Sequence, residues 1–441
     1  MSSDSYRLDS LLEVTSSKRI HMADYVPSGV PFYRGKEVIE RAKGNPVSTE
    51  LFITQAQYQE IKRKFGSPQD GDVLLTSVGT LGVAYFVEGD GDFYFKDGNV
   101  TWFRNFDPRV VPKYLYYWLT SPETQKRLDE VSIGSTQRAL TISALKSLQV
   151  QLPSVDSQKA IVDMLDAVTN RITLLRETNA TLEAIAQALF KSWFVDFDPV
   201  RAKMEGRTPE GMDEATAALF PDGFETSELG EVPRGWRWGT LSDLATFQNG
   251  YAFKSKDWTD VGHPVVKIGD VKPGIIDLEG CSYVTRETVV GLDRFRLSRG
   301  DLLVGMTGYV GETGLVPSVE PAAYLNQRVG RMATKSGIAD LGYLYCAARS
   351  PAFKEFAEAQ SHGSAQANVS GASLMAFPTV IAPLPLMERF NGAIADVLEV
   401  VLTNHEQAQT LSTLRDTLLP RLISGQLRLP ETENLVKALI F

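Results

Sequence analysis

The chain has 441 residues, with 54 Asp and Glu against 45 Lys and Arg, and a formal net charge of −9. At roughly 100–200 residues per domain, this length predicts about two to four domains, and a content of 43% hydrophobic and 22% charged residues excludes a disordered chain. The acidic balance by itself argues against a nucleic-acid partner, because a DNA-binding surface must offset the phosphate charge.

Cysteine content and hydropathy limit the class of protein further. Cys281 and Cys346 are too few for a disulfide framework or a Cys-rich zinc site. The opening residues MSSDSYRLDS lack the apolar core of a signal peptide, and no apolar run approaches the ~20 residues of a membrane helix. We therefore expect a cytoplasmic protein with no membrane partner.

The chain contains two copies of the same arrangement, a globular module followed by a long helical region. Residues 1–152 and 236–385 form two modules with strand-like runs between glycines, for example around 72–75 and 301–304. A proline-marked boundary and a long helical region follow each module, at 153–203 and at 386–430, and residues 431–441 form a tail. An acidic linker, 204–235, separates the two copies.

An internal repeat supports this division. Residues 71–82 read GDVLLTSVGTLG and residues 300–311 read GDLLVGMTGYVG, and we call the spacing from Gly71 to Gly300 the repeat offset. The same offset relates GSTQ at 134–137 to GSAQ at 363–366. Weaker matches, such as 31–34 with 264–267, are spaced slightly wider. We infer a duplicated chain with a few small insertions.

The first helical region carries a heptad seam. Positions 161, 165, 168, 172, 175, 179, 182, 186 and 189 are apolar except for Asn179. Asn179 either fixes the register of a coiled coil or is a solvated residue at the end of the seam. A weaker seam runs through Val397, Val401, Asn404, Ala408, Leu411 and Leu418, and Arg415 interrupts it.

Each seam needs a partner, and the other copy's helix is the nearest one. We therefore expect an α+β protein in which two tandem mixed α/β modules are joined by two long antiparallel coiled-coil helices with pseudo-twofold symmetry. Such a duplicated arrangement suits a partner with two similar but non-identical sites, and DNA read in two half-sites is one.

The acidic total has a local source. Residues 204–231 contain eight acids and one base, a net charge of −7, among recurring Gly and Pro residues. This composition predicts an exposed linker with one short helix at 214–219. Residues 18–64, by contrast, hold nine bases and five acids. The linker should lie off a DNA path, with positive charge gathered where the modules face the duplex.

Basic, amide and aromatic residues in or beside glycine-marked loops are candidates for DNA contact, because Arg and Lys bind phosphate or guanine while Asn and Gln pair with adenine. In the first module they are Lys18, Arg19, Tyr33, Arg34, Lys36, Ser77, Thr80, Thr136, Gln137 and Arg138. In the second they are Tyr251, Lys254, Lys256, Lys267, Thr307, Tyr309, Gln327, Arg328, Gln366 and Asn368.

No catalytic or metal-binding residue is predicted. The chain lacks a G-x4-G-K-[ST] phosphate loop and a G-x-G-x-x-G dinucleotide motif. His405 and Glu406 begin a string like HExxH, but Gln409 stands where the second histidine would be, which favours a solvated helix residue.

Four strings resemble DNA-specificity subunits of type I restriction–modification enzymes. ALFKSWFVDFDPVRAK at 188–203 resembles the end of that family's central helical region, and LRDTLLPRLISG at 414–425 resembles its second helical region. PFYRGK at 31–36 and FQNGYAFK at 247–254 are similar to openings of target recognition domains. The resemblance extends over nearly the whole chain.

The resemblance implies a non-catalytic subunit in which each target recognition domain reads one half of a bipartite DNA sequence. The paired helices would act as a ruler and would dock two methyltransferase subunits, which methylate adenine N6. Two motor–nuclease subunits would be further partners and would cleave unmodified DNA. S-adenosylmethionine, ATP and Mg would belong to those partners, with no cofactor in this chain. The residues assigned to docking are Leu182, Leu189, Trp193, Phe194, Leu411 and Leu418, although Trp193 and Phe194 could instead pack within the chain.

Two other functions remain open at this stage. The chain could be a stand-alone modification methyltransferase or nuclease with a cryptic site, and the missing motifs weigh against it. It could also be a coiled-coil protein scaffold, and the basic, amide-bearing loops weigh against that alternative.

Overall fold

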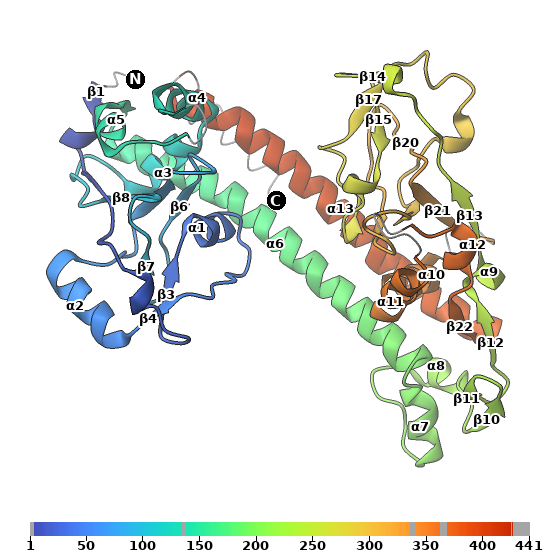
Figure 1. Cartoon of the computed structure of the whole chain (residues 1–441). Helices are drawn as coiled ribbons and strands as arrows, with labels where there is room; N and C mark the ends of the chain where they lie inside the picture. Colours follow the sequence, from blue (N-terminus) through green and yellow to red (C-terminus); the bar gives the residue numbers. More distant parts are fainter. Residues whose placement is uncertain (1–3, 135–137, 336–340, 362–367, 425, 427–441) are drawn as a thin grey trace. The chain divides into compact units, whose positions relative to one another are not determined.

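The computed structural model describes residues 4–134, 138–335, 341–361, 368–424 and 426 (Figure 1). The chain divides into two compact units. Unit 1 consists of residues 1–172 together with 410–441, and unit 2 of residues 173–409. Each long helical region is therefore shared between the two units.

Unit 1 is built on a four-stranded sheet of order β2-β8-β5-β6 and a three-stranded sheet of order β4-β3-β7, with β1 paired to β9. Its strands are β1 (Asp4–Arg7), β2 (Glu13–Thr15), β3 (Val30–Tyr33), β4 (Phe52–Ile53), β5 (Val73–Thr76), β6 (Ala84–Phe86), β7 (Tyr94–Phe95), β8 (Val100–Arg104) and β9 (Gln149–Leu152). Its helices are α1 (Gly35–Ala42), α2 (Gln55–Phe65), α3 (Pro112–Thr120), α4 (Pro122–Val131), α5 (Ile142–Ser147) and the start of α6 (Val155–Phe194).

Unit 2 is built on sheets of order β13-β21-β18-β19-β16 and β14-β17-β15-β20, with β12 paired to β22 and β10 to β11. Its strands are β10 (Phe224–Ser227), β11 (Gly230–Pro233), β12 (Arg237–Thr240), β13 (Ala245–Asn249), β14 (Trp258–Thr259), β15 (His263–Val266), β16 (Gly274–Ile275), β17 (Ser282–Val284), β18 (Leu302–Gly305), β19 (Thr313–Leu315), β20 (Tyr324–Leu325), β21 (Val329–Thr334) and β22 (Pro378–Ile381). Its helices are α7 (Asp198–Met204), α8 (Glu214–Ala218), α9 (Leu241–Leu244), α10 (Leu341–Arg349), α11 (Pro351–Ala359), α12 (Gly371–Met375) and most of α13 (Leu384–Ile423).

The predicted repeat is confirmed at the level of single elements. Strands β5 and β18, strands β6 and β19, and helices α6 and α13 all begin one repeat offset apart. Buried contacts repeat as well. The hydroxyl of Tyr114 donates to the carbonyl of Gln151, and that of Tyr343 donates to the carbonyl of Val380, at the same offset. The two units thus share one framework.

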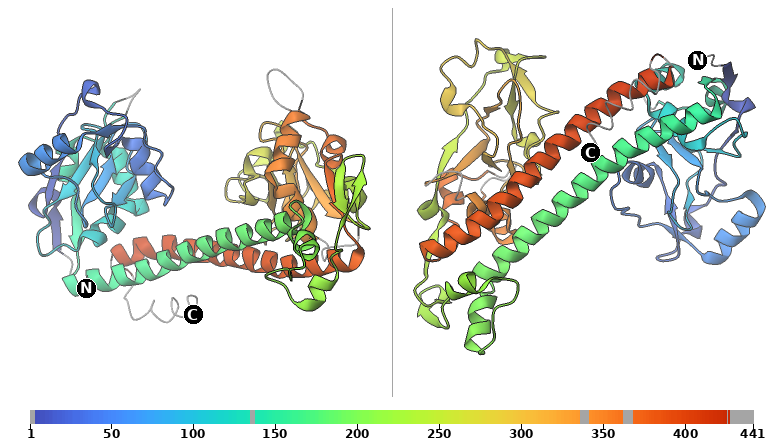
Figure 2. Two further views of the ribbon diagram at one scale, coloured as in Figure 1. Left: turned by 90° about the horizontal axis from the view of Figure 1, so that it is seen from below. Right: turned by 180° about the vertical axis from the view of Figure 1, so that it is seen from behind.

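The helical seams are confirmed, and α6 and α13 lie side by side within each unit in both views (Figures 1 and 2). In unit 2, Phe190 of α6 packs against Phe390, while Asn179 bonds further along α13, so the two helices run antiparallel. Asn179 donates to the Val401 carbonyl at 2.8 Å and accepts from the Asn404 amide at 2.9 Å. Asn179 is therefore a half-buried member of the seam and not a solvated end residue.

The expectation of an exposed acidic linker is wrong in part. Residues 198–233 fold into α7, α8 and the β10–β11 hairpin. Phe220 and Val232 belong to the core of unit 2, and Ala217 is buried as well. The predicted short helix is present as α8. The eight acids themselves stay exposed, because apolar residues between them supply the packing.

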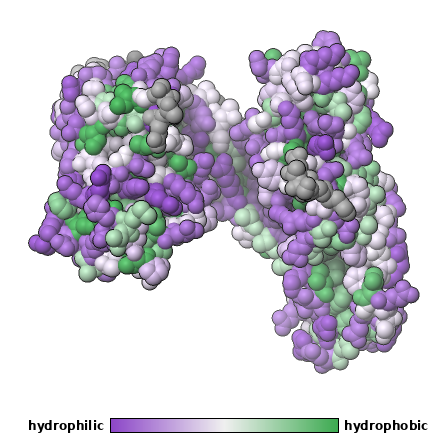
Figure 3. Space-filling model, in the orientation of Figure 1, coloured by the Kyte–Doolittle hydropathy of each residue, from purple (hydrophilic) through white to green (hydrophobic). Residues whose placement is uncertain are grey.

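The expectation for His405 also needs correction. Its side chain is half-buried on α13, and burial lowers its pKa because the charged form loses hydration. Within the described residues, no cluster of His, Cys, Asp and Glu could hold a metal ion. No described helix is long and apolar enough to span a membrane, and hydrophilic and hydrophobic residues are interspersed over the face of each unit drawn in Figure 3.

Candidate nucleic-acid interface

A glycine-rich hairpin loop occupies the same place in both units. Residues 77–83 join β5 to β6, and residues 306–312 join β18 to β19. Gly79, Gly82, Gly308 and Gly311 all have positive φ, which L-residues with a side chain adopt at a cost. A Cβ on Gly311 would lie 2.8 Å from the Ala357 Cβ, so this turn is pressed against α11. The turn geometry therefore requires these glycines.

Two further segments converge on each hairpin. The amide of Ser77 donates to the Asn99 carbonyl at 2.7 Å, and the Leu140 amide donates to the Ser77 carbonyl at 2.9 Å. In unit 2 the Met306 amide donates to the Arg328 carbonyl at 3.1 Å, and the Val369 amide donates to the Met306 carbonyl at 2.9 Å. These bonds recur at the repeat offset, so one backbone arrangement is used twice.

We call the three converging segments of each unit its loop edge. In unit 1 the loop edge comprises residues 77–82, 98–99 and 138–140. In unit 2 it comprises residues 306–311, 327–328 and 368–369. Eight of the twenty residues predicted to contact DNA lie on these two edges, although they are far apart in the sequence.

On the loop edges, exposure separates the predicted residues into two groups. The exposed ones are Thr80, Arg138, Tyr309, Gln327, Arg328 and Asn368, and 62% of Tyr309 is exposed. Ser77 and Thr307 are buried, which contradicts a direct contact with DNA. The Ser77 hydroxyl lies 2.7 Å from that of Thr101, and the Thr307 hydroxyl donates to Asn368 Oδ1 at 2.8 Å. Both hydroxyls stabilise the loop from beneath.

Arg138 is turned back onto its own unit. Its guanidinium forms an ion pair of 2.6 Å with Asp129 and donates to the Ser132 hydroxyl at 2.8 Å. Thr136, Gln137 and Gln366 lie outside the described residues.

Helix α1 borders the loop edge of unit 1 and encloses a concavity of about 550 Å³ with it. Its polar lining is supplied by Arg34, Lys36, Glu40, Lys43, Asn45, Thr80 and Asn99, and the carboxylate of Glu40 is paired with Lys36. The sequence prediction missed Lys43, Asn45 and Asn99. The repeat could have identified Asn99, because it lies one repeat offset before the predicted Arg328.

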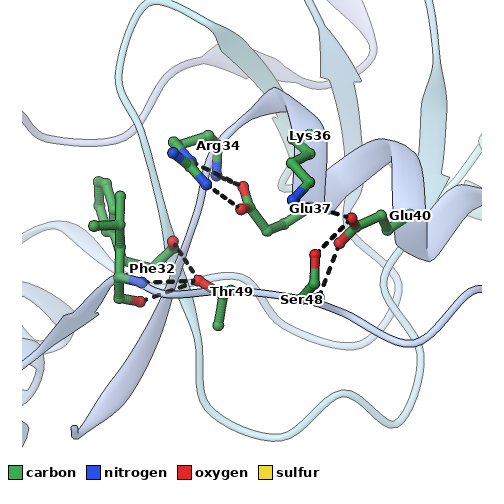
Figure 4. Close-up of polar contacts among 8 residues, drawn as sticks. Phe32, Arg34, Lys36, Glu37, Glu40, Ser48 and Thr49 are labelled. Atoms are coloured by element: carbon green, nitrogen blue, oxygen red, sulfur yellow. Dashed lines mark hydrogen bonds and ion pairs between the residues drawn. The ribbon is translucent and has the colours of Figure 1, made fainter. Parts of the chain in front are cut away.

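Arg34 holds the first turn of α1 together (Figure 4). Its guanidinium donates to Glu37 Oε1 at 2.7 Å, and its own amide donates to Glu37 Oε2 at 2.7 Å. Burial alone would raise the pKa of Glu37, but the bonds from Arg34 outweigh burial and hold that pKa below its usual value. Arg34 is therefore a positioning residue for the helix as well as a cation at the concavity.

The positive charge of residues 18–64 is largely offset within unit 1. Six of the nine bases form ion pairs, including Arg19 with Asp97 and Lys36 with Glu40. Lys18 lies over the Phe65 ring at 4.7 Å. Lys43 has no such pair among the described residues and is exposed. Exposed ion pairs contribute little to stability, so phosphate could replace the carboxylate partners.

The aromatic and basic residues predicted at the openings of the modules have mixed roles. Tyr33 is buried and stacks on Phe93 at 4.7 Å, which contradicts a DNA contact. The ammonium of Lys267 lies 3.8 Å from the Trp258 ring centre and donates to Ser282, so it is engaged within unit 2. Lys254 and Lys256 are exposed. Tyr251 is half-buried, and its backbone carbonyl accepts a hydrogen bond from the backbone N–H of Gln327, which joins this segment to the loop edge.

The residues assigned to subunit docking are mostly internal. Trp193, Phe194, Leu411 and Leu418 are buried, and Leu182 and Leu189 are half-buried. Trp193 packs 5.1 Å from Phe220 and 5.5 Å from Phe390, measured between ring centres. The packing role is therefore the one observed for Trp193 and Phe194. The large apolar residues exposed on α6 and α13 are instead Leu174, Ile185, Leu384 and Val400.

Comparison with known proteins places this geometry in a family context. A sequence model of the type I restriction modification DNA specificity domain matches residues 3–184 and 233–414. The chain is 27% identical over 411 residues to the type I restriction enzyme HindI specificity subunit of Haemophilus influenzae, covering 81% of this chain and 86% of that one.

A second relative is the MjaIX specificity subunit of Methanocaldococcus jannaschii, 24% identical over 366 residues, with 82% of this chain and 78% of that one covered. Among solved structures, the S subunit of the type I restriction–modification system from M. genitalium matches with a TM-score of 0.51 and 17% identity over 96% of both chains. This last match shows the fold.

Proposed function

The chain belongs to the family of type I restriction–modification DNA specificity subunits, and from that premise we propose that each unit reads one half of a bipartite DNA target through its loop edge. A specificity subunit provides the sequence recognition of a restriction–modification complex and has no catalytic role of its own. The observation that carries the proposal is the recurrence of one loop edge in both units with different exposed side chains on it.

The loop edges and the segments beside them together offer the two kinds of contact that specific DNA binding requires. Lys36 and Lys43 in unit 1, and Lys254 and Lys256 in unit 2, supply cations for phosphate. Asn99 in unit 1, and Gln327 and Arg328 in unit 2, supply side chains able to bond base edges. We assign the target recognition domains to residues 1–152 and 236–385 on this basis.

The long helices, within 153–203 and 386–430, would set the distance between the two half-sites. A rigid helix pair transmits length directly, at about 1.5 Å for each residue. The acidic segment, 204–235, would lie away from the DNA, because its eight exposed acids repel phosphate.

The partners follow from the same assignment. The chain would assemble in the cytoplasm with two methyltransferase subunits that use S-adenosylmethionine to methylate adenine N6, and with two motor–nuclease subunits that use ATP and Mg²⁺. Among the exposed apolar side chains of α6 and α13, Leu174, Ile185 and Val400 are the residues best suited to docking, because they lie within the helices and away from their ends.

The decisive experiment inserts one heptad into both α6 and α13 and maps the methylated sites of cells that carry the assembled complex. Seven residues add about 10 Å to each helix, so the spacer between half-sites should lengthen by about 3 base pairs. The matched control inserts the heptad into α6 alone, which puts the two seams out of register and should abolish methylation.

An unchanged spacer length in the double-insertion variant would contradict the proposal that the long helices set the distance between the half-sites. Methylation of DNA by the purified chain with S-adenosylmethionine alone would contradict the non-catalytic assignment. An absence of any bipartite motif in the methylated sites of the unaltered complex would contradict the reading of two half-sites.

A further inference from the structure

One backbone position on the loop edges carries a different base-reading side chain in each unit. Asn99 accepts the Ser77 amide through its carbonyl and directly precedes β8. Arg328 accepts the Met306 amide in the same way and directly precedes β21. The two residues are separated by the repeat offset that relates the two hairpins. The framework therefore presents Asn in one unit where it presents Arg in the other.

Among the residues that the structure describes, neither side chain is held by a polar contact. Within the described residues, the Asn99 amide and the Arg328 guanidinium form no hydrogen bond or ion pair with another side chain. Nearby arginines behave differently. Arg331, shortly after Arg328 on β21, bonds Asp301 at 3.0 Å and Gln248 at 2.7 Å. Arg328 is exposed and unsatisfied, so its N–H groups are available to a ligand.

The surroundings of both residues suit a duplex. Asn99 lines the concavity of unit 1 together with Lys43 and Thr80, so a phosphate-binding cation and a polar loop tip lie beside it. Arg328 follows the exposed Gln327, and the carbonyl of Arg328 is bonded to the hairpin whose tip carries the exposed Tyr309. No acid in the described loop edge of unit 2 competes for Arg328.

We propose that this position determines specificity in both half-sites, with Asn99 reading an adenine in one and Arg328 reading a guanine in the other. An amide can donate to adenine N7 and accept from its N6, while a guanidinium donates to both N7 and O6 of guanine. The inference rests on the proposed function, and it adds the base identity at one position of each half-site.

The test exchanges the two side chains in the full chain, assembled with its methyltransferase partners. Asn99→Arg should change the preferred base at one position of one half-site from adenine to guanine. Arg328→Asn should change guanine to adenine in the other half-site. Each change should shift the preference by about 5–150-fold, the range of a good bidentate pair, and leave the remaining half-site unaltered. Binding to duplex libraries randomised in both half-sites measures the preference.

Conservative variants and a charge control accompany the exchange. Asn99→Gln should keep the preference for adenine, and Arg328→Lys should keep a weaker preference for guanine, because each new side chain retains the hydrogen-bonding groups of the old one. Arg207→Asn removes one cation that is ion-paired with Glu205 in the acidic segment, and it should change no base preference.

The outcomes separate this inference from the function beneath it. An unchanged base preference in Asn99→Arg and Arg328→Asn overturns the inference, as does a uniform loss for all sequences with a shallower salt dependence, which identifies a phosphate contact. An exchange variant that does not assemble is replaced by Asn99→Ala or Arg328→Ala, and an unchanged preference for adenine or guanine in that variant then overturns the inference. An unaltered complex without any sequence preference contradicts the proposed function itself.

Discussion

The two units share a framework but diverge directly after the equivalent strands β3 and β15. In unit 1, Arg34 and Glu37 begin the eight-residue helix α1. In unit 2, Lys267 and Asp270 make the same backbone bond, amide to carboxylate at 2.7 Å, but enclose only one 3-10 turn. The comparison shows that the duplicated framework fixes where a loop begins, while the following residues decide what surface it builds.

The ends of the long helices differ in a similar way. In unit 2 the C-terminal part of α6 packs Phe190, Trp193 and Phe194 against Phe390. In unit 1 the equivalent part of α13 buries Leu419 and Leu422. Aromatic rings bury more surface, and in unit 2 they also pack against Phe220 of the folded acidic segment and against Trp236, the residue that follows that segment. The acidic segment thus packs against the aromatic C-terminal end of α6.

The largest expected effect tests the aromatic packing at the C-terminal end of α6. Phe194→Ala should reduce the free energy of unfolding of unit 2 by about 3–5 kcal/mol, because it opens a cavity among the surrounding aromatic rings. Leu422→Ala should reduce that of unit 1 by about 2–4 kcal/mol. Hydrogen-exchange mass spectrometry of peptides from each unit separates the two effects. If either variant caused an equal loss of protection in both units, the two units would unfold together. The proposed difference between the aromatic and aliphatic helix ends would then be wrong.

A smaller effect is expected on DNA binding, and it should be confined to one half-site. Lys36→Glu together with Lys43→Glu should weaken binding to one half-site about 10–100-fold, because both ammonium groups border the concavity of unit 1. Arg34 is left intact, since its charge reversal would also break the bonds to the buried Glu37.

Duplexes with one half-site scrambled measure this effect, and Lys64→Glu, whose partner is Glu60 on α2, is the matched control. Equal weakening at both half-sites would mean that the units do not read DNA separately.

The smallest effect concerns the two capping carboxylates and their response to pH. The pKa of Glu37 lies below its usual value, whereas burial raises the pKa of Asp270 above its usual value despite the Lys267 amide. The ammonium of Lys267, which is engaged by Trp258 and Ser282, lowers the pKa of Asp270 less than burial raises it.

The sign of the two contributions is therefore opposite. Glu37 stabilises unit 1 above the unfolded pKa of about 4.3, and this contribution is lost as the pH falls through its lowered pKa. Asp270 contributes most below about 3.9, and its contribution falls as the pH rises through its raised pKa.

Glu37→Gln should thus reduce the stability of unit 1 at pH 7 by about 1–2 kcal/mol, and by less at pH 4. Asp270→Asn should leave unit 2 nearly unchanged at pH 7. Urea denaturation at both pH values, followed by hydrogen exchange of each unit, measures the difference. A loss in Glu37→Gln that grows on acidification would contradict the assigned pKa direction.

Much of the framework was predictable because its signals are local. The GDVLL and GDLLV strings marked β5 and β18, and the spacing of apolar residues marked α6 and α13. The exposure of individual polar residues was not predictable. Ser77 and Thr80 lie close together in one loop, yet only Thr80 is exposed, because Thr101 on the neighbouring strand engages the Ser77 hydroxyl.

By itself the sequence determined the duplication, the two heptad seams, the chain order and the family, since periods and strings are properties of neighbouring residues. The tertiary structure decided that Trp193 and Phe194 are buried, that the acidic segment folds onto them, and that Asn99 and Arg328 occupy equivalent places. These features depend on contacts between segments far apart in the chain, such as Trp193 with Phe390, and burial follows from such contacts rather than from residue type.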